Sequence, residues 1–295
     1  MKRIGWKIYL ILFIAFLIVP IVKVSAQGPV AITISPLKSF FSIEPGQKAQ
    51  GSIFITNPST KKMRVKPRVV SFETIDDQGT LQINEGDFSD YIRLPVSVFE
   101  LEPEQKREIK FDVIAPQNVN GGKYLSILFA TDVIEDGAGS FFSGEVGSLV
   151  FLEILGELEK EIKIKSFEID PINWKRLKIE VTLENTGNTH LAPFGEMKVY
   201  NWRKKQIDLI PFYFPEILPG KERTVEYEVY KNLLGKYTAE LNLINDGWDL
   251  VTEKRQFWVF NKGPVVIVLC GIVVVIFIIA FFIKSYKRRN HAKKK

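Results

Sequence analysis

The stretch KIEVTLENTGNTH, residues 178–190, decides the fold class. Ile179, Val181 and Leu183 alternate with charged or polar residues until Asn185 opens a turn. Successive side chains of an extended chain point to opposite faces, so this pattern predicts a strand with one face on a core and the other in water. Residues 28–263 repeat such runs between turns rich in Asn, Asp, Gly and Pro, and no segment there keeps a helical period for three turns. This pattern of short alternating runs and turns is typical of an all-β protein.

An internal repeat divides this region in two. The first copy reads SIFITNPSTKK (52–62), LEPEQKREIKFDV (101–113) and GGKYLSILF (121–129). The second reads KIEVTLENTGNTH (178–190), ILPGKERTVEYEV (217–229) and LGKYTAELNL (234–243). Each copy has the length of one immunoglobulin-like module. We expect two tandem antiparallel β-sandwiches of immunoglobulin-like type, over residues 28–157 and 158–260.

The two ends of the chain carry apolar segments of a different kind. Residues 1–26 have the charged start, apolar run and small-residue site of a secretory signal peptide, with an uncleaved first anchor as the alternative. Residues 264–283 are twenty residues without a charge, about 30 Å as a helix, and the basic tail 284–295 follows. The sequence predicts a signal helix, one transmembrane helix and a cytoplasmic tail, and thus a single-pass plasma-membrane protein with its N-terminus outside.

The positive net charge belongs to these ends. Of the 40 Lys and Arg, four lie in residues 1–26 and seven in residues 284–295, which leaves 29 against 34 Asp and Glu between them. The central region is therefore acidic, which argues against nucleic acid as a partner. Its lack of any Cys, the single one being Cys270, favours a bacterial envelope protein over a disulfide-stapled animal ectodomain.

Catalytic chemistry finds little support in the sequence. His190 is the one histidine before the tail, so His/Cys metal sites are excluded, and it reads as an exposed turn residue rather than a triad member. No phosphate-binding glycine motif occurs. A carboxylate pair of the glycosidase kind is the remaining enzymatic reading. We therefore expect a protein that is not an enzyme and uses no cofactor or catalytic residue.

Four cations form the first candidate binding surface. Lys62, Arg64, Lys66 and Arg68, here called the basic stripe, occupy alternate positions of one strand. Such a row about 7 Å apart suits an anionic wall polymer. The alternative is an edge strand that cations protect against pairing with other chains.

Two adjacent aromatics form the second candidate. Phe141 and Phe142 lie in a Gly- and Ser-rich segment between strands expected at 122–134 and 146–155, which we predict to pair as a long hairpin. On a loop tip these rings can contact a ligand, or they can fold back onto the sheet.

A resemblance to a known family rests on three stretches: ISPLKSFFSIEPGQKAQGSIFITNPSTKKMRVKPRVVSF (34–72), DYIRLPVSVFELEPEQKREIKFDVIAP (90–116) and GGKYLSILFATDV (121–133). Together with the layout of the chain, they resemble the WxL-interacting proteins of Gram-positive bacteria. The resemblance implies a peptidoglycan-binding first domain, a second immunoglobulin-like domain, a membrane helix and a basic tail. It implies no defined binding residue.

Three functions follow as hypotheses. The first is a surface protein that binds cell-wall peptidoglycan, an anionic wall polymer or another surface protein. The second is a chaperone- or assembly-like protein that accepts a partner's strand on a sheet edge, which requires an unpaired edge. The third is an envelope hydrolase, which requires two facing acids in a cleft.

Overall fold

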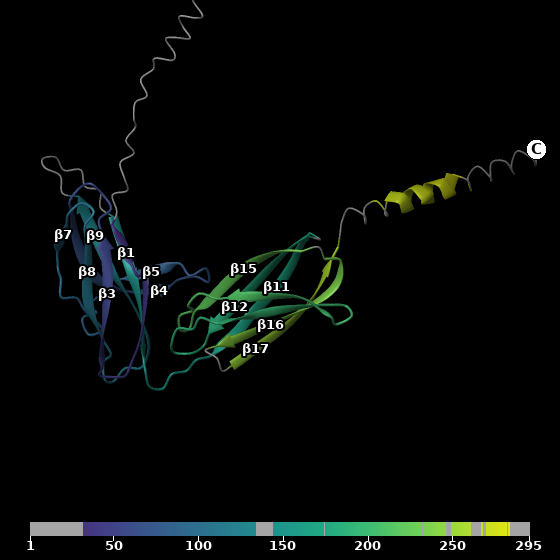
Figure 1. The fold of residues 1–295 in the computed structure, drawn as a ribbon. Helices are drawn as coiled ribbons and strands as arrows, with labels where there is room; N and C mark the ends of the chain where they lie inside the picture. The colour runs from purple at the N-terminus through teal and green to yellow at the C-terminus, as the bar shows by residue number, and fades with distance from the viewer. Residues whose placement is uncertain are drawn as a thin grey trace, which may run out of the picture.

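The computed structural model describes residues 32–133, 144–173, 175–231, 233–245, 249–260, 267, 270–281 and 283. Its main body is two β-sandwiches that follow one another along the chain, as Figure 1 shows. Each has a core of its own, one formed by residues between Ile32 and Ile154 and the other by residues between Ile162 and Val259. The all-β sandwich fold predicted from the sequence is confirmed.

The described residues of the N-terminal sandwich form ten strands. They are β1 (Thr33–Ser35), β2 (Lys38–Ile43), β3 (Lys48–Thr56), β4 (Met63–Thr74), β5 (Leu81–Asn84), β6 (Ile92–Arg93), β7 (Phe99–Leu101), β8 (Lys106–Ile114), β9 (Gly121–Val133) and β10 (Gly144–Ile154). One sheet has the order β1-β3-β8-β6, and the other has the order β2-β10-β9-β4-β5 with β7 also paired to β4. β9 and β10 form the predicted long hairpin.

The start of the chain changes sheets within this sandwich. β1 pairs with β3 in one sheet, and after Pro36 and Leu37 the chain crosses to the other sheet, where β2 pairs with β10. β2 therefore runs parallel to β10, although antiparallel pairing was expected throughout. The difference arises because the chain moves to the other sheet after β1 without reversing its direction. β2 then lies beside β10, which runs in the same direction.

In the C-terminal sandwich, the part that the structure describes forms seven strands. They are β11 (Ile162–Asn173), β12 (Arg176–Asn185), β13 (Phe194–Asn201), β14 (Gln206–Tyr213), β15 (Glu222–Tyr230), β16 (Gly235–Asn245) and β17 (Asp249–Val259). They form the sheets β11-β12-β15 and β14-β13-β16-β17. Residues 178–185 of the deciding stretch lie in β12, where the burial of Ile179, Val181 and Leu183 confirms the predicted core face. Thr182, predicted on the water-facing side, is buried as well.

The C-terminal segment differs from its prediction. Among the described residues of this segment, 267, 270–281 and 283 are helical. Within the described part of the chain, no helix combines enough length and apolar character to cross a membrane. This finding corrects the predicted single-pass plasma-membrane placement through residues 264–283. The signal-peptide prediction for 1–26 and the tail 284–295 lie outside the described residues.

Candidate functional site

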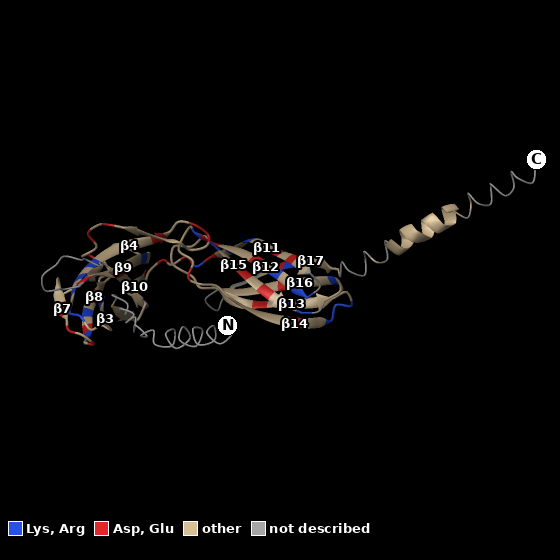
Figure 2. Ribbon diagram, turned by 90° about the horizontal axis from the view of Figure 1, so that it is seen from above, with Lys and Arg blue, Asp and Glu red and all other residues tan. Residues whose placement is uncertain are grey.

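The basic stripe lies on the outward face of the strand that starts at Met63, and acidic residues accompany it. Lys62 Nζ lies 2.8 Å from Glu102 Oε1 and 3.1 Å from Glu100 Oε2. Arg64 approaches the same Glu100 at 3.8 Å. Hydrogen bonds to Glu102 and Glu100 raise the pKa of the Lys62 ammonium above its ordinary value. Figure 2 shows this mixing of cationic and acidic positions on both sandwiches.

The other half of the stripe shows the same pairing. Arg68 bonds Glu145 of β10 through two nitrogens, at 2.9 and 2.8 Å, and also contacts Glu85. Hydrogen bonds to Glu145 and, to a smaller extent, to Glu85 raise the pKa of the Arg68 guanidinium. Lys66 is exposed. Three of the four cations thus have carboxylate partners within the chain, so the stripe does not present the bare positive ladder that an anionic polymer would bind. Phe141 and Phe142 lie outside the described residues.

A row of rings crosses the outer face of the sheet that contains β2 and β10. Phe72 of β4, Tyr124 of β9, Phe151 of β10 and Phe40 of β2 each contribute one ring. The centroid distances are 6.0 Å for Phe72–Tyr124, 5.9 Å for Tyr124–Phe151 and 4.9 Å for Phe151–Phe40. Strand register causes the row, since Phe151 stands opposite both Tyr124 and Phe40. We call these four residues the ring row.

The C-terminal sandwich packs against the ring row. Leu218 forms a buried cluster with Phe72 and Phe151. The His190 ring lies 5.2 Å from Phe151, 5.7 Å from Tyr124 and 5.8 Å from Phe40. Burial raises the pKa of the Tyr124 hydroxyl. His190, expected as an exposed turn residue, is instead a half-buried part of the contact between the sandwiches.

A backbone contact at Gly121 and Gly122 fixes this packing. The Gly122 amide donates to the Asn188 carbonyl at 2.9 Å, and the Asn188 amide donates to Glu159 of the linker at 2.9 Å. Gly121 has a φ of +81°, and a Cβ there would lie 2.7 Å from the Asn188 carbonyl oxygen. Glycine therefore admits both the left-handed backbone and the neighbouring turn. Gly122 begins the Gly-Lys-Tyr sequence that both copies of the repeat share, so this sequence in the first copy contributes to the contact between the sandwiches.

Further polar contacts link the two sandwiches. The ammonium of Lys38 lies 2.6 Å from Glu216, and that of Lys221 lies 2.9 Å from Glu73. Burial acts to raise the pKa of Glu216, but the hydrogen bond from Lys38 and nearby positive charge outweigh it and lower the pKa. The turn between β4 and β5 also reaches β15, where the Thr224 amide donates to the Asp77 carbonyl at 2.8 Å.

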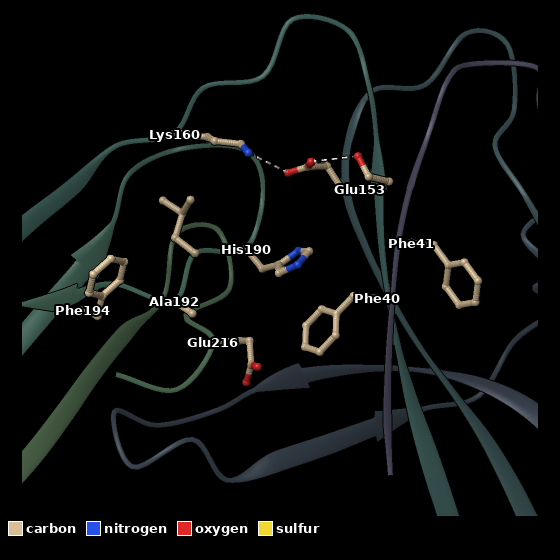
Figure 3. Close-up of a pocket in the computed structure, with 10 residues that line it drawn as sticks. Phe40, Phe41, Glu153, Lys160, His190, Ala192, Phe194 and Glu216 are labelled. Carbon is tan, nitrogen blue, oxygen red and sulfur yellow. Dashed lines mark hydrogen bonds and ion pairs between the residues drawn. The ribbon is translucent and has the colours of Figure 1, made fainter. Parts of the chain in front are cut away.

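Between the sandwiches lies a cavity of about 430 Å³, which we call the cleft. β2 forms one wall, and the segment from His190 to Phe194 forms the other, as Figure 3 shows. Phe40 points into the cleft, whereas Phe41 points away into the N-terminal core. Glu216 lies beside the cleft, and Glu153 lies 3.3 Å from Lys160 at its rim.

A free sheet edge borders the cleft. The carbonyls of Leu37 and Ile43 accept hydrogen bonds from Leu149 and Leu155 at the β10 side. Both backbone groups of one residue point to the same side of a strand, so those of Lys38, Phe40 and Ser42 point away from β10. In the described ranges, no strand pairs with the side of β2 that points away from β10. Residues 144–148 of β10 extend past the end of β2, and on the side opposite β9 they too have no strand partner there. We call these two stretches together the free edge.

Two other sheet edges, those of β14 and β11, are covered or interrupted. The Tyr227 hydroxyl accepts from the Tyr213 amide and donates to its carbonyl, at 3.0 and 2.9 Å, which caps β14. Register shifts interrupt β11, and Arg255 donates to its Phe167 carbonyl at 2.8 Å. These devices hinder pairing with other chains. The free edge carries no such cap that the described residues show.

Sequence reasoning missed the cleft because its residues lie far apart in the chain. The alternation of β2 indicates that Phe40 and Phe41 face opposite ways, but not that a second sandwich faces Phe40. The region described by the structure contains no group of three or more His, Cys, Asp and Glu that could hold a metal ion.

Comparisons with known proteins complete the description. No family model matches the chain, and no curated protein matches it. The class 5 fimbriae chaperone CfaA is similar in structure, with 9% identity over 78% of this chain and 99% of that one, at a TM-score of 0.42. The E. coli chaperone DraB has 12% identity over 79% and 97%, at 0.37. The Pseudomonas aeruginosa chaperone CupB2 has 12% identity over 77% and 100%, at 0.37.

These findings correct two predictions. The WxL-interacting family assignment is wrong, because no family model supports it. The assignment of peptidoglycan or an anionic wall polymer as partner is wrong as well, and the paired carboxylates of the basic stripe supply the physical reason.

Proposed function

We propose that this protein has a chaperone- or assembly-type role, in which the free edge accepts an extended segment of another polypeptide. The observation that supports this most directly is the outward direction of the backbone groups of Lys38, Phe40 and Ser42 beside the cleft. Unpaired N–H and C=O groups in a row bind an added strand through main-chain hydrogen bonds. The cap on β14 and the interruptions of β11 support the same interpretation, because the free edge has no such protection within the described residues.

The arrangement of the two sandwiches suits this role. Contacts at Leu218, at Gly122 and at Thr224 hold the sandwiches together at three separate places. A preformed cleft loses less conformational entropy when a partner binds than a cleft that must close around the partner. The partner segment would gain hydrogen bonds from β2 and side-chain contacts from both walls.

Site-directed crosslinking tests the proposal in cells that produce the full chain. A photoreactive benzophenone residue replaces Ser42, which is exposed on the free edge. The control places it at Gln82, exposed on β5 at the opposite end of the same sheet order. We expect a defined polypeptide partner to crosslink from position 42 and not from position 82. Equal products from both positions, or none from position 42, would contradict the proposal.

A pair of substitutions then separates the backbone from the side chain. Ser42→Pro removes one outward N–H, whereas Ser42→Ala removes only the hydroxyl. We expect the proline variant to lose most of the co-isolated partner and the alanine variant to retain it. If both variants lost the co-isolated partner, the partner would depend on the Ser42 side chain and not on the backbone N–H.

A further inference from the structure

The ring row ends at a ring that is only half covered. Phe72 and Phe151 are buried at 4% and 3% exposure, while Phe40 remains 53% exposed. The strands β4, β9, β10 and β2 contribute one ring each, and β2 is the end strand of that sheet order. A strand added to β2 would place one of its own side chains beside Phe40 on the same face.

The opposite wall of the cleft offers a second aromatic contact. Phe194, at the start of β13, lines the cleft and is 47% exposed. Figure 3 shows Phe40 and Phe194 on opposite sides of the cavity, with the His190 ring beside Phe40. A cavity of about 430 Å³ lies within the range of pockets that enclose small ligands, so one aromatic side chain fits it.

The charges around the cleft favour a neutral occupant. Glu216 is paired with Lys38 at 2.6 Å, and Glu153 is paired with Lys160 at 3.3 Å. Each carboxylate of these walls thus has its cation already. A charged side chain that entered the cleft would lose hydration without gaining a new counterion, whereas an aromatic ring would gain edge or face contacts with Phe40.

From this geometry we infer that the cleft is a specificity pocket for one aromatic side chain of the partner strand, seated between Phe40 and Phe194. The inference rests on the proposed function, because the strand that pairs with β2 carries the ring. The partner is then an extended polypeptide segment whose register on β2 is set by an aromatic residue. Main-chain hydrogen bonds provide binding, and the cleft selects the sequence.

A displayed library of random nonapeptides, selected on the full chain, tests this inference. We expect the selected peptides to carry Phe, Tyr or Trp at one shared position. Phe40→Ala and Phe194→Ala should each weaken a selected peptide about three- to tenfold, in line with the worth of an aromatic pair. Phe40→Leu should keep part of the affinity if Phe40→Ala disturbs the fold. Phe54→Ala, at a 37% exposed ring of β3 outside the cleft, is the control and should bind as the parent does.

The possible outcomes separate the two proposals. Selected peptides that bind at the free edge but carry a conserved Lys, Arg, Asp or Glu, or no shared residue, would overturn the aromatic pocket and leave strand acceptance standing. A library that yields no peptide bound at the free edge would overturn both. Aromatic enrichment that survives in Phe40→Ala and Phe194→Ala would also overturn the pocket, because the ring would then bind elsewhere.

Discussion

The Phe40 ring stacks on the Phe151 ring at a centroid distance of 4.9 Å and an interplanar angle of 22°, yet Phe40 keeps half of its surface exposed. Phe151 is buried in the contact between the sandwiches, whereas Phe40 faces the cleft. The structure that stabilises the interface therefore also shapes the candidate binding site.

Leu218→Ala tests how much the interface contributes to stability. Leu218 is 4% exposed and packs on Phe72 and Phe151. Truncation of a buried leucine leaves a cavity, so we expect a loss of about 2 kcal/mol in the free energy of unfolding, measured by denaturant titration. Leu209→Ala, at a 48% exposed leucine, should cost less than about 0.5 kcal/mol. Equal costs would show that Leu218 does not pack as described.

Gly121→Ala tests the contact with the Asn188 turn. Both Gly121 and Gly220 have positive φ, but only at Gly121 would a Cβ meet a carbonyl oxygen, at 2.7 Å; nothing lies within 4 Å at Gly220. Gly220→Ala thus measures the backbone strain alone, about 1 kcal/mol. We expect Gly121→Ala to lose clearly more stability in thermal unfolding. A smaller loss than at Gly220 would contradict the described packing.

The stability of the protein should depend on the charge of Glu216 at acidic pH. Its pKa is lowered in the folded protein, below the ordinary value of 4.5. A lowered pKa contributes stability that is present above the ordinary value and is lost as pH falls through the folded value. We expect the stability gap between the parent and Glu216→Gln to narrow as pH falls below about 4.5. Lys38→Met should remove the same pH dependence, and a gap that stays constant to pH 3 would contradict the assignment.

Tyr227→Phe tests whether the cap on β14 protects that edge. The variant keeps the ring that packs 4.2 Å from Phe212 and removes the hydroxyl that satisfies both backbone groups of Tyr213. We expect a stability loss of about 1 kcal/mol and greater self-association in sedimentation velocity, because an edge becomes open. A variant as monomeric and as stable as the parent would show that the cap is dispensable.

The fold class could be predicted from the sequence, because a strand with one buried face and one exposed face alternates apolar and polar residues. The buried Ile179, Val181 and Leu183 and the hairpin of β9 and β10 follow from such local patterns. The parallel pairing of β2 with β10 does not, since the change of sheet after Ser35 depends on which strand has a free neighbour in space.

The candidate site lay beyond sequence reasoning for a similar reason. Lys38 and Glu216 meet across 178 positions of the chain, and no local pattern links them. The basic stripe was visible as cations on one face, but the carboxylates that pair with it come from other strands and loops, such as Glu145 on β10. Charge along one strand does not show the charge that the fold places beside it.

Hydrogen exchange of the β2 amides, with and without a peptide selected from the library, tests strand acceptance most directly. The account predicts that added peptide slows exchange at Lys38, Phe40 and Ser42, whose amides point outward. Ser39 and Phe41, which already face β10, should change little. Peptide binding that leaves the amides of Lys38, Phe40 and Ser42 unprotected would contradict it.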